Sequence, residues 1–222
     1  VKLEVARKYP YLNGNTDFVV KNQQFYFLEG ITWSSLSTSG FSIRSFDDGF
    51  IFADKGQCLF PNNIEDKNIF TSLLNTKIID KLLMIISPTM DYHSGYLKKL
   101  PIIFPNEEST KQQINTLTQE CIDISKEEWD SRETSWDFRT NELVRILNDE
   151  FLILNEKPKL EMVYNRYCEY WSEKFYKLHA NEEELNRLFI DIYELGDELT
   201  PDVALKDITI LKSESIINDN NE

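Results

Sequence analysis

The sequence predicts an α+β protein in which a β-rich N-terminal domain with a packed helix is followed by a mainly α-helical domain. Glycines and alternating aromatic residues concentrate in the first part, where six of the seven glycines precede Ser109. Apolar residues after Pro105 recur instead at the three- to four-residue spacing of one helix face. Charge divides at the same point: residues 1–105 carry 11 lysines and arginines against 10 acidic residues, and residues 106–222 carry 13 against 28. We therefore expect domains at residues 1–105 and 106–212, with a flexible tail at residues 213–222.

The composition is that of a folded protein. Hydrophobic residues make up 41% of the 222 positions, which is enough for a core. The longest apolar cluster, at residues 82–86, is far shorter than the roughly 18 residues of a membrane span, so we expect no contact with a membrane. The three cysteines are widely spaced and are interpreted as buried side chains in a reducing cytoplasm. No apolar region follows the basic residues after Val1, so we expect no signal peptide and interpret the chain as part of a longer protein.

Short β-strands are predicted throughout the first 60 residues. The sequence around Leu3 and Val5 is strand-like, and aromatic runs at residues 18–20 and 25–28 predict two more strands. A β-meander is then predicted, with strands at residues 31–36, 41–46, 50–52 and 58–60 and turns at residues 37–40, 47–49 and 54–56. Within the second of these strands, alternation buries Phe41 and Ile43 and directs Arg44 to the other face.

Helices are predicted in most of the remaining chain. An apolar 3.6-residue period predicts a helix over residues 69–85, which ends at Ser87 and Pro88. An extended segment at residues 101–105 precedes a helix at residues 106–124. A capping box at residues 125–128 predicts a new helix start. Further helices are predicted at residues 142–154, from Pro158 through residue 178, and from Asn181 to Gly196, before a last strand at residues 208–211.

Common catalytic and metal-binding motifs are absent from the sequence. It contains no Gly-rich dinucleotide or phosphate loop, no H-E-x-x-H and no G-x-S-x-G. The two histidines are 86 positions apart, so a histidine-based metal site is not expected. Residues 65–67 match half of a metal-dependent nuclease pattern, but the required upstream Pro-Asp is missing, and a solvated turn explains them better. We therefore assign no catalytic, cofactor-binding or metal-binding residue.

The first part of the chain carries side chains suited to DNA. Lysines and arginines contact phosphates, and small polar side chains contact base edges. The candidate DNA-binding residues are Thr32, Ser34, Ser35, Ser37, Arg44, Lys55, His93, Lys98 and Lys99. On its own this chemistry also fits an ordinary Ser/Thr-rich turn.

Several blocks of sequence resemble the target-recognition region of large adenine-specific DNA methyltransferases. The similarity is to the PglX type of BREX phage-defence systems, which is related to fused methylase–specificity proteins of restriction-modification systems. It rests first on the blocks ITWSSLS at residues 31–37, GFSIR at 40–44, GFIF at 49–52 and DKG at 54–56. Three segments resemble the helix-and-proline segment that closes such recognition domains: LLNTKI at 73–78, ISPTM at 86–90 and GYLKKLPI at 95–102. Segments that resemble the helical part that follows are SKEEWD at 125–130, ETSWDF at 133–138 and NEEELNRLFIDIY at 181–193, and DELTP at 197–201 fits as well.

The resemblance implies a specificity fragment whose catalytic domain lies upstream of Val1. Enzymes of this family transfer a methyl group from S-adenosylmethionine to adenine N6, and their catalytic motif contains Pro-Pro, which is absent here. No cofactor is therefore expected within this chain. The implied partners are double-stranded DNA, the upstream methyltransferase domain and other defence-system proteins, in the cytoplasm.

Two other functions compete with this interpretation. In the first, the chain is a protein-interaction scaffold of a defence complex without direct DNA contact, and the Tyr- and Trp-rich helix at residues 164–178 docks a partner. The second, a free-standing hydrolase, lacks a recognisable motif.

Overall fold

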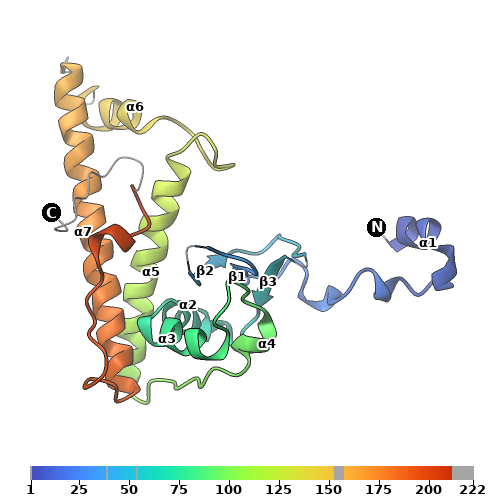
Figure 1. The fold of residues 1–222 in the computed structure, drawn as a ribbon. Helices are drawn as coiled ribbons and strands as arrows, with labels where there is room; N and C mark the ends of the chain where they lie inside the picture. The colour runs from blue at the N-terminus through green and yellow to red at the C-terminus, as the bar shows by residue number, and fades with distance from the viewer. Residues whose placement is uncertain (1, 39, 54, 153–157, 212–222) are drawn as a thin grey trace.

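A computed structural model describes residues 2–38, 40–53, 55–152 and 158–211 and has an α+β fold, as predicted. Two long helices, α5 (Glu108–Asp130) and α7 (Leu160–Ile192), lie side by side and run in opposite directions (Figure 1). A small sheet with helices α2 to α4 packs against one end of this pair, and an N-terminal arm extends away from the sheet. Within the described ranges, no helix is long and apolar enough to cross a membrane.

The sheet has three antiparallel strands in the order β2-β1-β3. Strand β1 (Gly30–Ser34) is central and pairs with β2 (Ile43–Phe46) on one side and β3 (Gly56–Leu59) on the other. The predicted meander is therefore wrong in its order, because the third strand returns to the free edge of the first. The predicted strand at residues 50–52 is also absent, although the Phe27 amide donates to the Phe50 carbonyl at 2.9 Å.

Helices α2 (Lys67–Leu74) and α3 (Lys77–Ile86) replace the single helix predicted at residues 69–85. The helix is interrupted at Asn75, whose side chain bonds the neighbouring strand. The Oδ1 atom of Asn75 accepts from the Ile43 amide at 2.9 Å, and its Nδ2 atom donates to the Ile43 carbonyl at 3.2 Å. The new start of α3 is satisfied by α7, since the Lys77 amide donates to Asn186 Oδ1 at 3.1 Å. Tertiary contacts thus determine the interruption between α2 and α3, which the apolar period of the sequence does not indicate.

The helices α5 and α7 are longer than predicted. Both run through motifs that were expected to start new helices, the capping box at residues 125–128 and Asn181. Asn181 is buried and donates to Glu120 Oε2 of α5 at 2.8 Å, so its side chain joins two helices instead of capping one. At about 1.5 Å per residue, the 33 residues of α7 span about 50 Å.

The last described segment folds back along the two long helices. It contains one 3₁₀ turn, Leu205–Asp207, and no strand at residues 208–211, contrary to the prediction. Ile208 and Ile210 are instead buried against Ile124 of α5 and Phe175 of α7. Side chains bond the backbone of this segment in place of a neighbouring strand. For example, the Leu211 amide donates to Glu128 Oε1 of α5 at 3.2 Å. The predicted tail at residues 213–222 lies outside the described residues.

Helix α6 (Glu142–Ile146) continues as a π-helical turn, Leu147–Leu152, where one helix was predicted over residues 142–154. Residues 153 and 154 lie outside the described part. The short helix α4 (Ser94–Leu97) precedes an extended segment at residues 101–105, as expected.

One buried cluster crosses the boundary expected at Pro105. It joins Ile31 and Trp33 of the sheet to Leu73 of α2, Ile114 of α5 and Phe189 of α7. Both parts of the chain therefore share a core, although their charge differs. The division into domains at residues 1–105 and 106–212 stays a prediction, which rests on the difference in composition.

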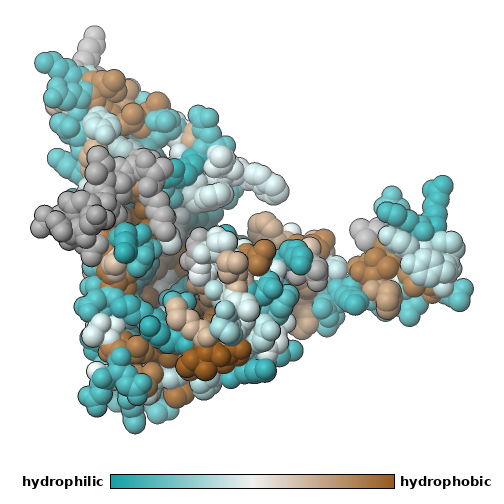
Figure 2. All heavy atoms as spheres, in the orientation of Figure 1, coloured by the Kyte–Doolittle hydropathy of each residue, from teal (hydrophilic) through white to brown (hydrophobic). Residues whose placement is uncertain are grey.

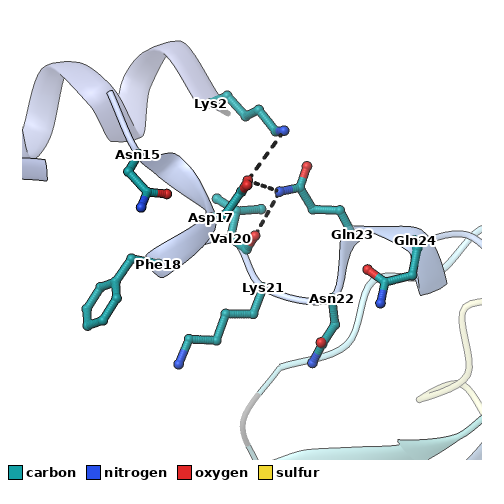
Figure 3. A pocket seen from close by; sticks show the side chains of 9 residues that line it. All are labelled: Lys2, Asn15, Asp17, Phe18, Val20, Lys21, Asn22, Gln23 and Gln24. Atoms are coloured by element: carbon teal, nitrogen blue, oxygen red, sulfur yellow. Dashed lines mark hydrogen bonds and ion pairs between the residues drawn. The ribbon is translucent and has the colours of Figure 1, made fainter. Parts of the chain in front are cut away.

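The N-terminal arm is irregular and helical where strands were predicted. It consists of α1 (Lys2–Lys8) and 3₁₀ turns at Pro10–Leu12, Thr16–Phe18 and Gln23–Phe25, none of which has a buried residue. Of these aromatic runs, the one at residues 25–28 makes a backbone pairing in which Phe27 bonds Gly49 and Phe50, and this pairing is too short to form a strand. In Figure 2 the arm stands apart from the rest of the molecule with hydrophobic side chains on its surface. Polar contacts are among those that hold the arm together: Asp17 forms an ion pair with Lys2 at 3.7 Å and accepts a hydrogen bond from Gln23 at 3.0 Å, beside an open hollow (Figure 3).

Candidate nucleic-acid interface

Arg44 and Thr32 lie on the outer face of the sheet, which is the face turned away from the core. Side chains alternate along a strand, so Thr32 and its register partner Arg44 point away from the face that buries Ile31 and Trp33. The exposed Arg44 Nη2 donates to Ser34 Oγ at 3.2 Å. The Thr32 hydroxyl donates a hydrogen bond to the Gln57 carbonyl at 2.9 Å. This face therefore offers one guanidinium, with four of its five N–H donors not used by that bond, beside an exposed hydroxyl.

The strand that carries Arg44 is held in place by Asn75. Because Asn75 satisfies both backbone groups of the adjoining Ile43, it fixes the edge strand one residue away from the guanidinium. A third bond, from Asn75 Nδ2 to the Thr71 carbonyl at 3.1 Å, ties the amide to α2. The position of Arg44 thus depends on a residue in the break between α2 and α3.

The serines after β1 differ in their access to solvent. Ser35 is buried, its amide donates to the Lys55 carbonyl at 3.3 Å, and its carbonyl accepts from Tyr92 at 2.8 Å. Its side chain does not reach the surface, so we leave it out of the interface. Ser37 is half-buried, and Lys55 is exposed at the start of β3.

His93, Lys98 and Lys99 lie on the opposite side of the sheet from Arg44. The segment before α4 covers the core face, where Trp33 Nε1 donates to the Tyr92 carbonyl at 2.7 Å. All three candidate side chains are exposed there. The Lys99 ammonium lies 5.8 Å from the centre of the Tyr96 ring, and that ring lies 6.4 Å from the imidazole of His93. The predicted DNA-binding residues therefore form two groups on opposite sides of the sheet, one around Arg44 and Ser34 and one around His93, Lys98 and Lys99.

The sequence did not identify three residues that shape this region. Asn75, Gln57 and Tyr96 act through contacts with residues far away in the chain or on a short helix, and no local pattern indicates such contacts. For Tyr96, the three-residue spacing of His93, Tyr96 and Lys99 is a usable signal, because the backbone bonds from Tyr96 to His93 and from Lys99 to Tyr96 close turns at the two ends of α4.

The long helices present a different electrostatic surface. Their carboxylates are paired across α5 and α7, as in the contacts of Lys177 with Glu120 at 3.0 Å and of Lys174 with Glu127 at 2.9 Å. Hydrogen bonds from Lys177 and Asn181 lower the pKa of Glu120. These carboxylates stay ionised but are partly neutralised by their lysines, so the repulsion of phosphate comes from the excess of acidic residues in this part of the chain, 28 against 13 basic ones.

Neither cysteine with a perturbed pKa is activated for reaction. Burial raises the pKa of the Cys121 thiol to about 12, and burial also raises the pKa of Cys58 in strand β3, so both are poor nucleophiles. Among the described residues, no group of three or more His, Cys, Asp and Glu side chains is arranged to hold a metal ion.

Comparison with known proteins gives the class and then the family. No protein-family model matches the chain. Over 192 residues it is 35% identical to the adenine-specific methyltransferase PglX of Lacticaseibacillus casei strain Zhang, a match that covers 86% of this chain and 15% of that protein. Over 188 residues it is 30% identical to the adenine-specific methyltransferase BrxX of Escherichia coli O9:H4 strain HS, covering 84% of this chain and 14% of that protein.

These matches relate the chain to adenine-specific methyltransferases. Within that class it belongs to the PglX and BrxX family of BREX-type enzymes, which confirms the resemblance found in the sequence blocks. The chain spans only about 15% of the length of these relatives, so it corresponds to one part of such an enzyme.

Proposed function

We propose that this chain is the DNA target-recognition part of a site-specific adenine-N6 DNA methyltransferase of the BREX type. The observation that carries the proposal is the exposed Arg44 on the outer face of the sheet, in a chain related to adenine-specific methyltransferases. An arginine with free donors is the side chain best suited to two acceptors on a guanine edge or to a phosphate. Phage defence and restriction-modification are the settings in which such an enzyme acts.

The part of the chain that contains the sheet, residues 1–105, faces DNA in this proposal. Residues 1–105 are nearly neutral, with exposed cations at both groups of the interface, whereas residues 106–222 carry 28 acidic residues against 13 basic ones. Phosphate attracts the first surface and repels the second. The long helices then turn away from DNA, towards the methyltransferase domain or other defence-system proteins.

Catalysis belongs to the part of the enzyme outside this chain. That part binds S-adenosylmethionine and receives the target adenine after it has left the base stack. The chain described here holds the duplex at the right position, and no residue of it takes part in methyl transfer. Such an enzyme works in the cytoplasm, where DNA and the methyl donor meet.

The N-terminal arm supports contact with that catalytic part. Its apolar side chains are largely exposed, with Leu3 at 89%, Tyr11 at 72% and Phe18 at 67% of their full accessibility. Apolar groups that are placed together on a protruding segment are typical of a protein-binding surface.

A second candidate function is a protein-interaction scaffold without DNA contact. It is favoured by Trp136 and Trp129 near the end of α5, which are 97% and 56% exposed. Exposed tryptophans are typical anchors of protein interfaces. In that case the acidic helices bind a partner protein and the sheet has only a structural role.

A salt-dependent titration separates the two functions. A labelled duplex of mixed sequence is titrated with the intact chain, and fluorescence anisotropy is measured at several salt concentrations. If Arg44, Lys55, Lys98 and Lys99 each neutralise one phosphate, log Kd rises against log salt with a slope of about 3 to 4. A chain that leaves the anisotropy unchanged at low salt is a scaffold, and the DNA proposal is then wrong.

A further inference from the structure

The orientation of the Gln57 side chain is set by a backbone amide. Gln57 lies in β3, and its Oε1 is 2.6 Å from the amide nitrogen of Ser94, at the start of α4. A backbone N–H can only donate, so the atom of Gln57 that faces it must be the carbonyl oxygen. The amide nitrogen of Gln57 therefore points the other way.

That nitrogen faces His93. Gln57 Nε2 is 3.2 Å from His93 Nδ1. Because an amide NH₂ group only donates, His93 Nδ1 must accept, and it carries no proton. In the neutral imidazole the proton then sits on Nε2. The exposed ring presents a hydrogen-bond donor on its free side.

His93, Tyr96 and Lys99 form a row around the short helix α4, with His93 directly before the helix and Lys99 two residues after it. The His93 ring is 6.4 Å from the Tyr96 ring at an interplanar angle of 35°, and the Lys99 ammonium is 5.8 Å from the centre of the same Tyr96 ring. The two end members of the row, His93 and Lys99, are exposed. A donor and a cation separated by an aromatic ring are suited to a chain of phosphates.

We propose that Gln57 is a positioning residue that holds His93 with its proton on Nε2, so that His93 donates a hydrogen bond to a phosphate of bound DNA. This inference rests on the proposed DNA-binding function, and it explains how the contact between His93 and a DNA phosphate is oriented. A purely structural Gln57 would tie β3 to α4 without any effect on the histidine tautomer. The tautomer is thus the property to measure.

The first experiment reads the tautomer in the chain without DNA. Two-bond ¹H–¹⁵N correlation spectra in alkaline buffer assign each imidazole nitrogen, and the His93→Ala variant identifies the signals of His93. We expect His93 to carry its proton on Nε2. In the Gln57→Glu variant the new carboxylate can only accept, so the proton should move to Nδ1.

His179 is the internal control for these spectra. Its Nε2 is 2.7 Å from the Val203 carbonyl oxygen, so that nitrogen donates whichever residue occupies position 57. Its signals should be the same in the wild type and in Gln57→Glu. A wild-type His93 with its proton on Nδ1, or a tautomer that does not change in Gln57→Glu, overturns the proposal.

The second experiment is a double-mutant cycle on DNA affinity in the same buffer. A hydrogen bond to a charged partner is lost in His93→Ala, so we expect about a tenfold rise in Kd. Gln57→Glu should have a similar effect in the wild type and a much smaller one in the His93→Ala background. The added negative charge acts in both backgrounds and cancels in the cycle.

The two experiments separate the possible failures. An equal effect of Gln57→Glu in both backgrounds shows that Gln57 does not act through His93, and the proposal is then wrong. If the tautomer changes as expected but no variant binds DNA, the proposed function is wrong and the phosphate contact falls with it. The proton on Nε2 would then remain as a structural result.

Discussion

Replacement of Asn75 by alanine is expected to destabilise the protein and to disturb the strand that carries Arg44. The Asn75 amide satisfies the backbone N–H and C=O of Ile43, a residue that is only 4% exposed. Each buried backbone group that loses its partner costs about 1–3 kcal/mol. For two groups we expect a loss of about 2–6 kcal/mol in the free energy of unfolding.

Urea denaturation followed by circular dichroism measures this loss, and a matched variant serves as its control. Asn62→Ala removes the same side chain from an exposed position shortly before α2 and should change stability by less than about 0.5 kcal/mol. Asn75→Asp retains the acceptor for the Ile43 amide but loses the donor, so it should lie between the wild type and Asn75→Ala. If Asn75→Ala is as stable as Asn62→Ala, Asn75 does not anchor the edge strand and our account of how Arg44 is positioned is wrong.

Two further predictions concern packing and pH. In Gly30→Ala the added methyl would lie 2.9 Å from a carbonyl oxygen of β3 and 3.1 Å from the Phe60 ring, so we expect a loss of about 1–3 kcal/mol in urea denaturation, and unchanged stability would contradict the close packing. Burial raises the pKa of Glu127, but hydrogen bonds from Lys174 and a tyrosine of α7 outweigh it, so the pKa lies below its usual 4.5. The stabilisation is then complete above about pH 4.5 and is lost as pH falls further. From about pH 6 to pH 3, Glu127→Gln should lose less stability than the wild type, whereas the exposed Glu173→Gln should follow the wild type; parallel curves for all three would refute the assignment.

The sequence predicts the main features of the fold where local pattern and tertiary contacts agree. Strand β2 lies within its predicted segment, and β1 begins one residue before its own, because the alternation that buries Ile31, Trp33 and Ile43 is also the alternation of the real sheet. The helix that begins near Pro158 was likewise predicted from its apolar spacing. In both cases one buried face determines the period.

The errors arise where a side chain bonds a distant residue. Asn181 has the sequence of a helix cap, yet it is buried between two helices and bonds Glu120, which lies 61 positions earlier. Asn75 interrupts a regular apolar period because it bonds Ile43 on a neighbouring strand. A local pattern cannot indicate such a partner, since the partner is set by the tertiary fold.

The candidate interface was predicted in part, for the same reason. The exposure of Arg44 follows from strand alternation, and the sequence was sufficient to predict it. The burial of Ser35 depends on Lys55 and Tyr92, which pack around it only in the folded chain. The bond between Gln57 and His93 joins residues 36 positions apart, so only the structure reveals it.

The central claim is that the part of the chain that contains the sheet binds DNA through its exposed cations. Its most direct test is the salt-dependent titration of a labelled duplex with Arg44→Ala, with Lys98→Ala/Lys99→Ala, and with Lys206→Ala as a control in the acidic part. We expect Arg44→Ala to reduce the salt slope by about 1, the double variant by about 2, and the exposed Lys206→Ala not at all. Equal slopes and affinities for all the variants and the wild type would contradict the claim.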